Sequence, residues 1–489
     1  MGARWIRWTS PLPRTSYPEK RFVQILASAA VFIVVCLALV SFSPGQGAGY
    51  APFHSASVGE PRRLHFLLPS DKSDARICKA MFSALVNGYP SPILLNWGLE
   101  ESSLEMNGYD MKAGKIWGVL QYLRALPRSA DDDLVLMSDA YDVWFQLPPD
   151  ILLARYDAAN ARANARIARE HGEVAVAAHN LAQTIIFGAE KFCWPRNHTD
   201  PACYAVPMST LRPDAYGPHT DSAEVKTQRP RFLNSGLIAG PVSDMRALYE
   251  RVHELWTAEA PVTHSDDEKA NDGDQNIFAE VYGRQEYARQ RIRGTNDWVF
   301  NFGESHANST LAHPSPDDRS WEFHIGLDLD GNMFQALNEA HMDLSFVTHA
   351  DSAQLAKFDR KHGTDTIYGP TDASFPFPAD LELLERKPFD ALVGEDTETS
   401  ALRRKGWADV PLATNFHART IPVALHHNGY NRLLKPWWRE VWWTVFGAGS
   451  RLLRDMRNQR TQLGAWTVKG VFLSWDELCE GFDRDVFPP

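Results

Sequence analysis

The sequence has no surplus of basic residues. Its 489 residues include 50 Lys and Arg against 61 Asp and Glu, which gives a formal net charge of −11. Nucleic-acid binding depends on clustered cations that neutralise phosphates, so the lack of such clusters argues against a broad nucleic-acid-binding surface. The chain has no internal repeats. It is 44% hydrophobic and 23% charged, a composition that is ordinary for a globular protein. A fibrous or wholly disordered protein is therefore not expected.

Charge is missing altogether from one long segment near the N-terminus. Phe22 to Phe42 carries no formal charge, and as a helix it would be roughly 30 Å long, about one hydrocarbon thickness. Basic residues precede it, and no charged residue follows until Glu60. The positive-inside rule then predicts a cytoplasmic tail at 1–21, with the remaining chain in a lumen or outside. A cleaved signal peptide is the competing interpretation, but the apolar run is too long and Ser43–Gln46 is a poor cleavage site.

Cysteine is scarce, with five residues in the chain. Cys36 lies in the predicted span, which leaves Cys78, Cys193, Cys203 and Cys479 in the part predicted to be lumenal, where disulfides persist. Cys193 and Cys203 are near enough in sequence to close a short loop. Free buried thiols are an equally good interpretation of this pair.

The part of the chain after the predicted anchor has features that agree with a lumenal location. Residues 43–61 are rich in Gly, Ser, Pro and Ala and are predicted to form a stem. Two acceptor triplets for N-glycosylation follow, Asn197-His198-Thr199 and Asn308-Ser309-Thr310. Such triplets are common by chance, so they agree with the topology without establishing it.

Short apolar runs alternate with helical patterns in the first part of the predicted domain. Strands are expected at Leu64–Leu68, Ile93–Asn96 and Leu134–Met137, with helices at Asp74–Val86 and Gly114–Leu126 between them. This alternation predicts an α/β fold with a mostly parallel central sheet.

The later part of the chain is less regular. Two stretches, near 195–230 and at 342–420, lack clear periodicity and are predicted to be insertions in one domain of residues 62–445. A C-terminal segment, 446–489, follows that domain. The other expected elements are a helix at Pro149–Glu170, a strand carrying a turn at Arg231–Gly240, helices at Met245–Trp256 and Gln275–Tyr282, two strands around a tight turn at Leu327–Leu337, and a last strand at Ile421–Gly429.

Two carboxylates follow the apolar run Leu134–Met137, in the sequence Asp139-Ala140-Tyr141-Asp142. In open α/β sheets ligands bind beyond the carboxyl ends of the strands, where a pair of acids is well placed to hold a hard divalent cation. Acids at a strand end also serve as turn or helix-cap residues, and for an isolated pair that is the commoner role. The rest of the chain must decide between the two interpretations.

The run LVLMSDAYDVWF at 134–145 resembles the metal-binding strand of the glycosyltransferase domain in procollagen lysyl hydroxylases and collagen galactosyltransferases. Five later segments are similar to that family and occur in the same order. They are IIFGAEKFCWP, RFLNSGLIAG, GDQNIFAEVY, LDLDGNMFQAL and IPVALHHNG. Together the six segments extend from about residue 62 to 432, and their order makes the signal specific. The resemblance implies a GT-A fold that uses a UDP-sugar and Mn²⁺.

The resemblance also implies three metal ligands. Asp142 would bind the ion directly, Asp139 would bind the metal or the ribose, and His426 takes the family's position in an H-x-N-G segment. His427 is the rival for that third place. An ion held in this way would neutralise the diphosphate leaving group as a Lewis acid.

Donor-binding residues follow from the same resemblance. Tyr141 and Gly429 match positions in the nucleotide-sugar site, and Lys115 is similar to a basic residue there. The family has a Lys where this chain has Arg432, which keeps the charge but not the residue type. Lys435, about one helical turn later, is an alternative.

On the sugar and acceptor side, Asn234 is similar to an Asn that faces the sugar, and Gly236 permits close approach of the backbone. Asp274-Gln275 matches the family's pair near the transferred sugar. Gly273 departs from the family by interrupting a run of acids, which leaves the acceptor side in doubt. Trp194 is interpreted either as a sugar contact or as a core residue.

Residues after Arg432 are too few for the iron dioxygenase domain of the hydroxylating relatives, and they contain no His, so hydroxylase activity is not expected. The aromatic segment Pro436–Trp443 is expected to pack over the domain, with the bilayer surface as the alternative.

The sequence thus predicts a metal-dependent hexosyltransferase, anchored as a single-pass type II protein in the Golgi or endoplasmic reticulum membrane with its catalytic domain in the lumen. It would move a hexose from a UDP-sugar to a hydroxyl of a protein or glycan. One alternative is a catalytically silent GT-A fold that acts as a lumenal binding or scaffold protein. The other is a haloacid-dehalogenase-like phosphatase using Asp328 and Asp330, although Asn332-Met333 replaces the usual Thr or Val of that loop.

Overall fold

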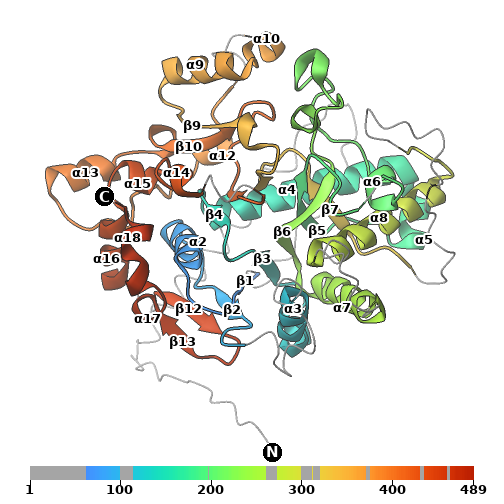
Figure 1. Ribbon diagram of the computed structural model, residues 1–489, viewed down its shortest axis with the longest axis horizontal. Coiled ribbons are helices and arrows are strands. Elements are labelled where there is room, and N and C mark those ends of the chain that lie inside the picture. Colours follow the sequence, from blue (N-terminus) through green and yellow to red (C-terminus); the bar gives the residue numbers. More distant parts are fainter. Residues whose placement is uncertain are drawn as a thin grey trace, which may run out of the picture. The chain divides into compact units, whose positions relative to one another are not determined.

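In the computed structural model of the protein, eleven strands of the described residues form the central sheet (Figure 1). Most neighbouring strands run parallel and helices pack on both faces, which confirms the predicted α/β class with a mostly parallel sheet. The described residues from Arg62 onward belong to one compact unit. They are 62–99, 114–196, 198–259, 273–298, 311, 320–369, 375–429, 434–459 and 463–488.

Several predicted features fall outside the described residues. They are the cytoplasmic tail at 1–21, the anchor at 22–42, the stem at 43–61, the asparagines of both glycosylation triplets, Asn197 and Asn308, and Arg432. Within the part that the structure does describe, no helix is both long and apolar enough to cross a membrane.

The first three strands follow the alternation that the sequence predicts. The elements are β1 (Leu64–Pro69), α2 (Ala75–Val86), β2 (Ile93–Leu95), α3 (Gly114–Ala125) and β3 (Leu134–Ser138). β1 lies between β2 and β3 and runs parallel to both. α2 begins where it does because the Asp74 carboxylate accepts the N–H of Arg76, one of the donors left open at a helix start.

β3 is apolar throughout because both of its faces are covered. Leu134 and Leu136 pack in a core with α2, whereas Val135 and Met137 pack in the opposite core with α3 and α7 (Val242–Glu259). Successive side chains of a strand alternate between the two faces, so a strand buried on both sides shows no polar alternation. Because β3 is packed on both faces, the position of its end is fixed. The strand leads directly into Asp139, the first carboxylate of the predicted site.

The strand expected at Arg231–Gly240 is present, but it carries no turn. The strands concerned are β5 (Ile185–Glu190) and β6 (Phe232–Pro241), and β6 runs antiparallel to both β3 and β5. The pairing of β5 with β6 shifts register, since Phe187 pairs with Ile238 and Gly188 with Asn234. The predicted turn is therefore wrong, and the sequence signal corresponds to a bulge, a device that re-aims side chains beside functional sites.

The two strands expected around a tight turn at Leu327–Leu337 do not form a hairpin. β7 (Ile325–Asp328) and β8 (Phe334–Ala336) both pair in parallel with β5. The hairpin interpretation is wrong because the shared partner is distant in sequence, and a local pattern gives no information about such pairing. Together β7 and β8 form an interrupted strand along one edge of β5.

The remaining part of the sheet brings a late strand beside an early one. β11 (Ala424–His426) lies between β8 and β4 (Val143–Phe145), parallel to the first and antiparallel to the second. The helices in this half of the unit are α4 (Pro149–His171), α5 (Glu173–His179), α6 (Pro201–Tyr204) and α8 (Asp274–Arg293).

The stretch 342–420, expected to be irregular, contains a second sheet. β9 (Leu344–Thr348) pairs antiparallel with β10 (Pro411–Asn415). Between these strands lie α9 (Ser352–His362), α10 (Asp365–Tyr368), α12 (Ala379–Glu382) and α13 (Thr397–Arg403). Most of these elements are too short to give a clear hydrophobic period, which is why the sequence did not reveal them.

The segment 446–489 continues the main sheet. β12 (Gly464–Thr467) runs parallel to β2, and β13 (Phe472–Ser474) forms the edge beyond it, so Ile421–Gly429 does not contain the last strand. The helices of the C-terminal part are α14 (Leu434–Trp438), α15 (Trp442–Val445), α16 (Gly449–Gln459), α17 (Trp475–Cys479) and α18 (Asp483–Val486).

Packing, rather than membrane contact, accounts for the aromatic segment at 436–443. Trp438, Trp442 and Trp443 are each no more than 1% exposed and belong to the core that contains α2. A disulfide between Cys78 of α2 and Cys479 of α17 holds the same contact covalently.

Candidate metal centre

The two predicted carboxylates lie in the turn that joins β3 to β4. Asp139 follows β3, and its backbone N–H donates to the carbonyl of Gly236 in β6 at 2.8 Å. Asp142 precedes β4, whose Val143 is paired with His426 of β11. The strand pairing therefore brings the predicted histidine beside the predicted acids, although the residues are far apart in sequence.

The three side chains converge as predicted. Carboxylate oxygens of Asp139 and Asp142 and a ring nitrogen of His426 all lie within 4.8 Å of one another. His426 Nε2 is 3.5 Å from Asp139 Oδ2 and 3.4 Å from Asp142 Oδ2. Two carboxylates and one neutral imidazole form a donor set that fits a divalent cation such as Mn²⁺.

Asn234 and Gly236 orient the imidazole of His426. The Nδ1 of His426 lies 2.8 Å from Asn234 Oδ1 and donates to that oxygen, so Nε2 is the ring nitrogen that faces the carboxylates and would bind an ion. Gly236 leaves room for the ring, because a Cβ at this position would come within 2.1 Å of His426 Cε1. The sequence assigns both residues to the sugar side of the predicted site. In the structure they also contact the ring of His426.

Acidic side chains outnumber basic ones around the centre. Burial raises the pKa of Asp139. Lys115 lowers this pKa, and the neighbouring Asp142 carboxylate raises it further, but the upward shift prevails. Burial also acts to raise the pKa of Asp142, but His426 outweighs it and holds that pKa below its ordinary value. For His426, burial lowers the pKa, but the two acids together outweigh burial and raise it above its ordinary value. A cation placed among these groups would relieve the repulsion between the carboxylates.

Lys115 connects the centre to the start of α8. Its Nζ lies 2.8 Å from Asp139 Oδ1 and 2.7 Å from Asp274 Oδ2, and the side chain is 9% exposed. Burial lowers the pKa of Lys115, but the two carboxylates outweigh burial and raise it. Gly273 precedes Asp274 with φ 76° and ψ −159°, a conformation that only glycine adopts readily. This backbone conformation explains why the chain has Gly273 where the family pattern has an acid.

A buried acid that the sequence analysis did not single out lies next to the centre. Glu190 ends β5, is 2% exposed, and accepts hydrogen bonds from three amide side chains. These come from Gln275 Nε2 at 2.7 Å, Asn428 Nδ2 at 3.0 Å and Asn234 Nδ2 at 3.3 Å. Burial raises the pKa of Glu190 to about 7 despite these bonds. Its signal was available, because Glu190 terminates the apolar run IIFGAE much as Asp139 terminates LVLMS.

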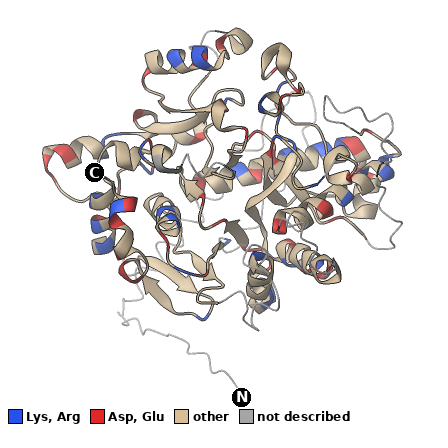
Figure 2. Cartoon of the chain, in the orientation of Figure 1, with Lys and Arg blue, Asp and Glu red and all other residues tan. Residues whose placement is uncertain are grey.

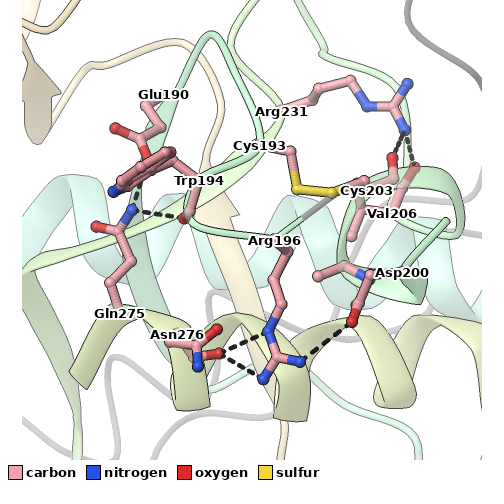
Figure 3. The surroundings of a disulfide bond; sticks show 11 residues. Glu190, Cys193, Trp194, Arg196, Asp200, Cys203, Val206, Arg231, Gln275 and Asn276 are labelled. Atoms are coloured by element: carbon pink, nitrogen blue, oxygen red, sulfur yellow. Dashed lines mark hydrogen bonds and ion pairs between the residues drawn. A yellow bond between two sulfur atoms is a disulfide. The ribbon is translucent and has the colours of Figure 1, made fainter. Parts of the chain in front are cut away.

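A disulfide-closed loop presents an indole beside this acid. Gln275 donates both to Glu190 and to the carbonyl of Trp194, and the Trp194 ring lies over these groups in Figure 3. Trp194 is 49% exposed, so the core interpretation is wrong. Cys193 and Cys203 form a disulfide, so the free-thiol alternative is wrong, and the bond closes the loop at its base.

The same loop is also attached to α8. Arg196 donates to the carbonyl of Asn276 and pairs with Asp200, which caps α6 (Figure 3). The position of Trp194 is thus fixed from both ends of the loop.

The predicted donor-binding residues lie on different sides of the centre. Tyr141 faces the end of β1, where its hydroxyl donates to Asp71 Oδ1 at 2.6 Å. Gly429 has φ 71° and packs so closely on Asn338 that a Cβ would come within 2.9 Å of it. Arg432 lies outside the described residues, as does the side chain of Lys435.

His427, the rival metal ligand, points away from the carboxylates. Its ring packs between Trp144 and Trp437, with centroids 4.0 Å and 5.6 Å away. It is fully buried, and burial lowers its pKa to about 3. His427 is therefore a packing residue.

The acid proposed for phosphatase chemistry is used by the backbone. The Asp328 carboxylate accepts the N–H groups of Asn332, Met333 and Phe334, so it stabilises the turn between β7 and β8. A carboxylate occupied in this way is not presented to a substrate.

Comparison with protein-family models gives no match, and no curated protein matches the chain significantly.

Proposed function

We propose that the unit beginning at Arg62 is a GT-A glycosyltransferase domain that moves a hexose from a UDP-sugar to a hydroxyl of a protein or glycan with the help of Mn²⁺. The observation that carries the proposal is the convergence of Asp139, Asp142 and His426 beyond the carboxyl end of β3. Ligands of open α/β sheets bind at such strand ends. The ordered resemblance of six segments supports the same assignment.

The cationic groups of the centre would act on the diphosphate. Asp139, Asp142 and His426 would hold the ion, which supplies Lewis-acid stabilisation of the leaving group when bound. Lys115, already placed between Asp139 and Asp274, would orient both acids and add positive charge on the donor side. Lys115 and His426 are buried, whereas the side chains of Asp139 and Asp142 are 28% and 24% exposed, so an ion and a diphosphate can reach the two carboxylates.

The amide groups around Glu190 would hold the sugar side. Asn234, Gln275 and Asn428 each donate to its carboxylate, so their side chains are pre-positioned before substrate binds. Glu190, whose pKa is raised to about 7, would hold or release a proton near neutral pH at Oε1 or Oε2. Asp274 and Tyr141 would bind the sugar and nucleotide ends of the donor. The exposed Trp194 would face the acceptor.

We further propose that this unit works in the lumen of the Golgi or endoplasmic reticulum, with the membrane anchor at 22–42. The disulfides Cys78–Cys479 and Cys193–Cys203 support an oxidising compartment, since such bonds are rare in reducing ones.

The direct test is Mn²⁺-dependent release of UDP from a panel of UDP-sugars by the full chain. We expect release from at least one donor, loss on chelation, and loss in Asp142→Ala. Asp157→Ala is the matched control, because Asp157 is exposed and pairs with Arg62 at the surface. A chain that binds UDP but turns over no donor would instead identify a catalytically silent fold.

A further inference from the structure

The strands of the central sheet carry almost no charge. Figure 2 shows charged residues mainly on the helices and loops, and among the described strands only β5 and β7 contain Asp, Glu, Lys or Arg, in each case as the last residue. After β5 a second charged residue, Lys191, follows Glu190 directly. The chemistry proposed above uses Glu190 but not Lys191.

Lys191 is completely buried and has three close partners. Its side chain is 0% exposed, and its Nζ lies 2.8 Å from Oδ2 of Asp343, whose side chain is 6% exposed. The Nζ also donates to the carbonyl of Lys226 and lies 4.5 Å from the centre of the Tyr216 ring. Burial lowers the pKa of Lys191, whereas Asp343 and Glu339 act to raise it. The charge of the amine therefore depends on its acidic partners.

These contacts join the two segments that the sequence predicts to be insertions, near 195–230 and at 342–420. Tyr216 belongs to the first segment and Asp343 to the second, and the Tyr216 hydroxyl donates to Asp343 Oδ2 at 2.7 Å. Lys191 contacts both residues. Its side chain thus attaches both segments to the end of β5.

Asp343 is the last residue of a turn, 337–343, whose start is held by the same end of β5. The first two N–H groups of the turn donate to Asn428 Oδ1 at 2.9 Å and 3.1 Å. Asn428 Nδ2 in turn donates to Glu190 Oε2 at 3.0 Å. Glu190 therefore holds the start of the turn through Asn428. Lys191 holds its end through Asp343.

The 337–343 turn contacts the candidate centre and reaches solvent. Its first N–H also donates to the carbonyl of His426 at 2.9 Å, and a Cβ at Gly429 would come within 2.9 Å of Asn338. Met342, near the other end of the turn, is 62% exposed. The turn is therefore placed to contact an acceptor that approaches the centre.

Stability alone is a weak explanation for the buried ion pair. Removing an ammonium and a carboxylate from water carries a desolvation cost, and apolar residues of similar volume are often at least as stable as such a pair. A charge-assisted hydrogen bond does fix the geometry of the groups that it joins. The position of the turn, more than the stability of the fold, is what the pair between Lys191 and Asp343 determines.

We infer that Lys191 is a positioning residue for the sugar and acceptor side of the candidate centre. Its ion pair with Asp343 holds the 337–343 turn, and through Asn428 the turn holds the carboxylate of Glu190. Because Lys191 is fully buried, it acts through these residues and not by contact with a substrate. Its effect on turnover rests on the proposed function, whereas its effect on the turn does not.

The first test measures amide hydrogen exchange of the full chain by mass spectrometry. Lys191→Met leaves Asp343 buried without its partner, so it is compared with a double variant, Lys191→Met with Asp343→Asn, which removes both charges and keeps an acceptor for Tyr216. We expect both to speed exchange in the 337–343 turn about tenfold through loss of a charged hydrogen bond. In the double variant, the urea midpoint and the exchange of β3 should match those of the unmodified chain.

Lys226→Met is the matched control. Its side chain is exposed and pairs with Glu224, and the substitution keeps the carbonyl that accepts from Lys191. Exchange in the 337–343 turn should be the same as in the unmodified chain.

The second test measures Mn²⁺-dependent UDP release. In the double variant we expect kcat to fall about tenfold or more, while KM for the UDP-sugar and the affinity for Mn²⁺ stay the same. A residue that served folding alone would have no effect on turnover once stability is restored.

Unchanged exchange of the 337–343 turn in both variants would overturn the inference, and so would a kcat that returns with stability in the double variant. An unmodified chain that releases UDP from no donor contradicts the glycosyltransferase proposal instead. The exchange measurement still decides in that case whether Lys191 holds the turn.

Discussion

The imidazole of His426 lies directly against the Cα of Gly236, so closely that a Cβ there would come within 2.1 Å of the ring. Gly236→Ala should therefore displace His426 from Asp139 and Asp142. We expect Mn²⁺ affinity to fall about 10- to 100-fold, the range seen when the support of a metal ligand is lost. Calorimetry with Mn²⁺ measures the change.

The control for this substitution is Gly481→Ala, because a Cβ at Gly481 meets no atom within 4 Å. It should leave Mn²⁺ affinity unchanged. Equal affinities in Gly236→Ala and the unmodified chain would show that the ring does not need this space.

The pKa of Glu190 makes folding stability depend on pH. The ordinary pKa is 4.5 and burial raises it to about 7. Between these values the unfolded chain has released the proton and the folded chain has kept it, so the free energy of unfolding falls as pH rises. The loss for this group is about 3 kcal/mol by pH 7 relative to a pH well below 4.5, and about 2 kcal/mol of it falls between pH 5 and pH 7. Urea unfolding with a chelator present, at pH 5 and pH 7, measures it.

The matched variant is Glu190→Gln, which keeps the shape of the side chain and cannot titrate. Its stability should change less between pH 5 and pH 7 than that of the unmodified chain. If the two chains show the same pH dependence, Glu190 is already ionised in the folded state.

The disulfide between Cys78 and Cys479 should contribute strongly to stability, because it closes a loop of sequence separation 401. Replacing both with Ser is expected to lower the free energy of unfolding by about 4–5 kcal/mol, the upper part of the range for such bonds. The Cys193–Cys203 pair closes a much shorter loop, and its removal should cost less. Urea unfolding of the two double variants gives the comparison, and an equal or reversed order would contradict it.

Asp328 distinguishes a structural acid from a catalytic one. Asp328→Ala leaves three backbone N–H groups without their acceptor, and we expect a loss of about 1–3 kcal/mol in unfolding free energy. The Mn²⁺-dependent release of UDP per folded molecule should stay the same. If the chain has a phosphatase activity that Asp328→Ala abolishes and Asp142→Ala leaves unchanged, the glycosyltransferase proposal is wrong.

The three candidate metal ligands could be predicted from sequence because two of them end recognisable apolar strands, and Asp142 lies in the short turn after the first of these. Asp139 follows a run buried on both faces, and His426 ends a strand within a motif of known order. Their meeting depends on the pairing of β4 with β11, which no local pattern reveals. The resemblance of six segments to one family, in the same order, supplied the information that these residues meet.

Glu190 was missed for a different reason. A single acid after an apolar run is usually a turn residue. The importance of Glu190 comes from Asn234 of β6, Gln275 of α8 and Asn428 in the turn after β11. Partners of this kind converge only in the folded chain. The β7–β8 error has the same origin, since both strands pair with β5 and not with each other.

The pairing of β12 with β2 has a consequence for biosynthesis. β2 is among the first strands to leave the ribosome, but the strand that covers its open edge is among the last. Until then its unpaired backbone groups remain available to other chains. A nascent chain therefore exposes that edge until Gly464–Thr467 have been synthesised, and truncation before Gly464 is expected to leave it unpaired.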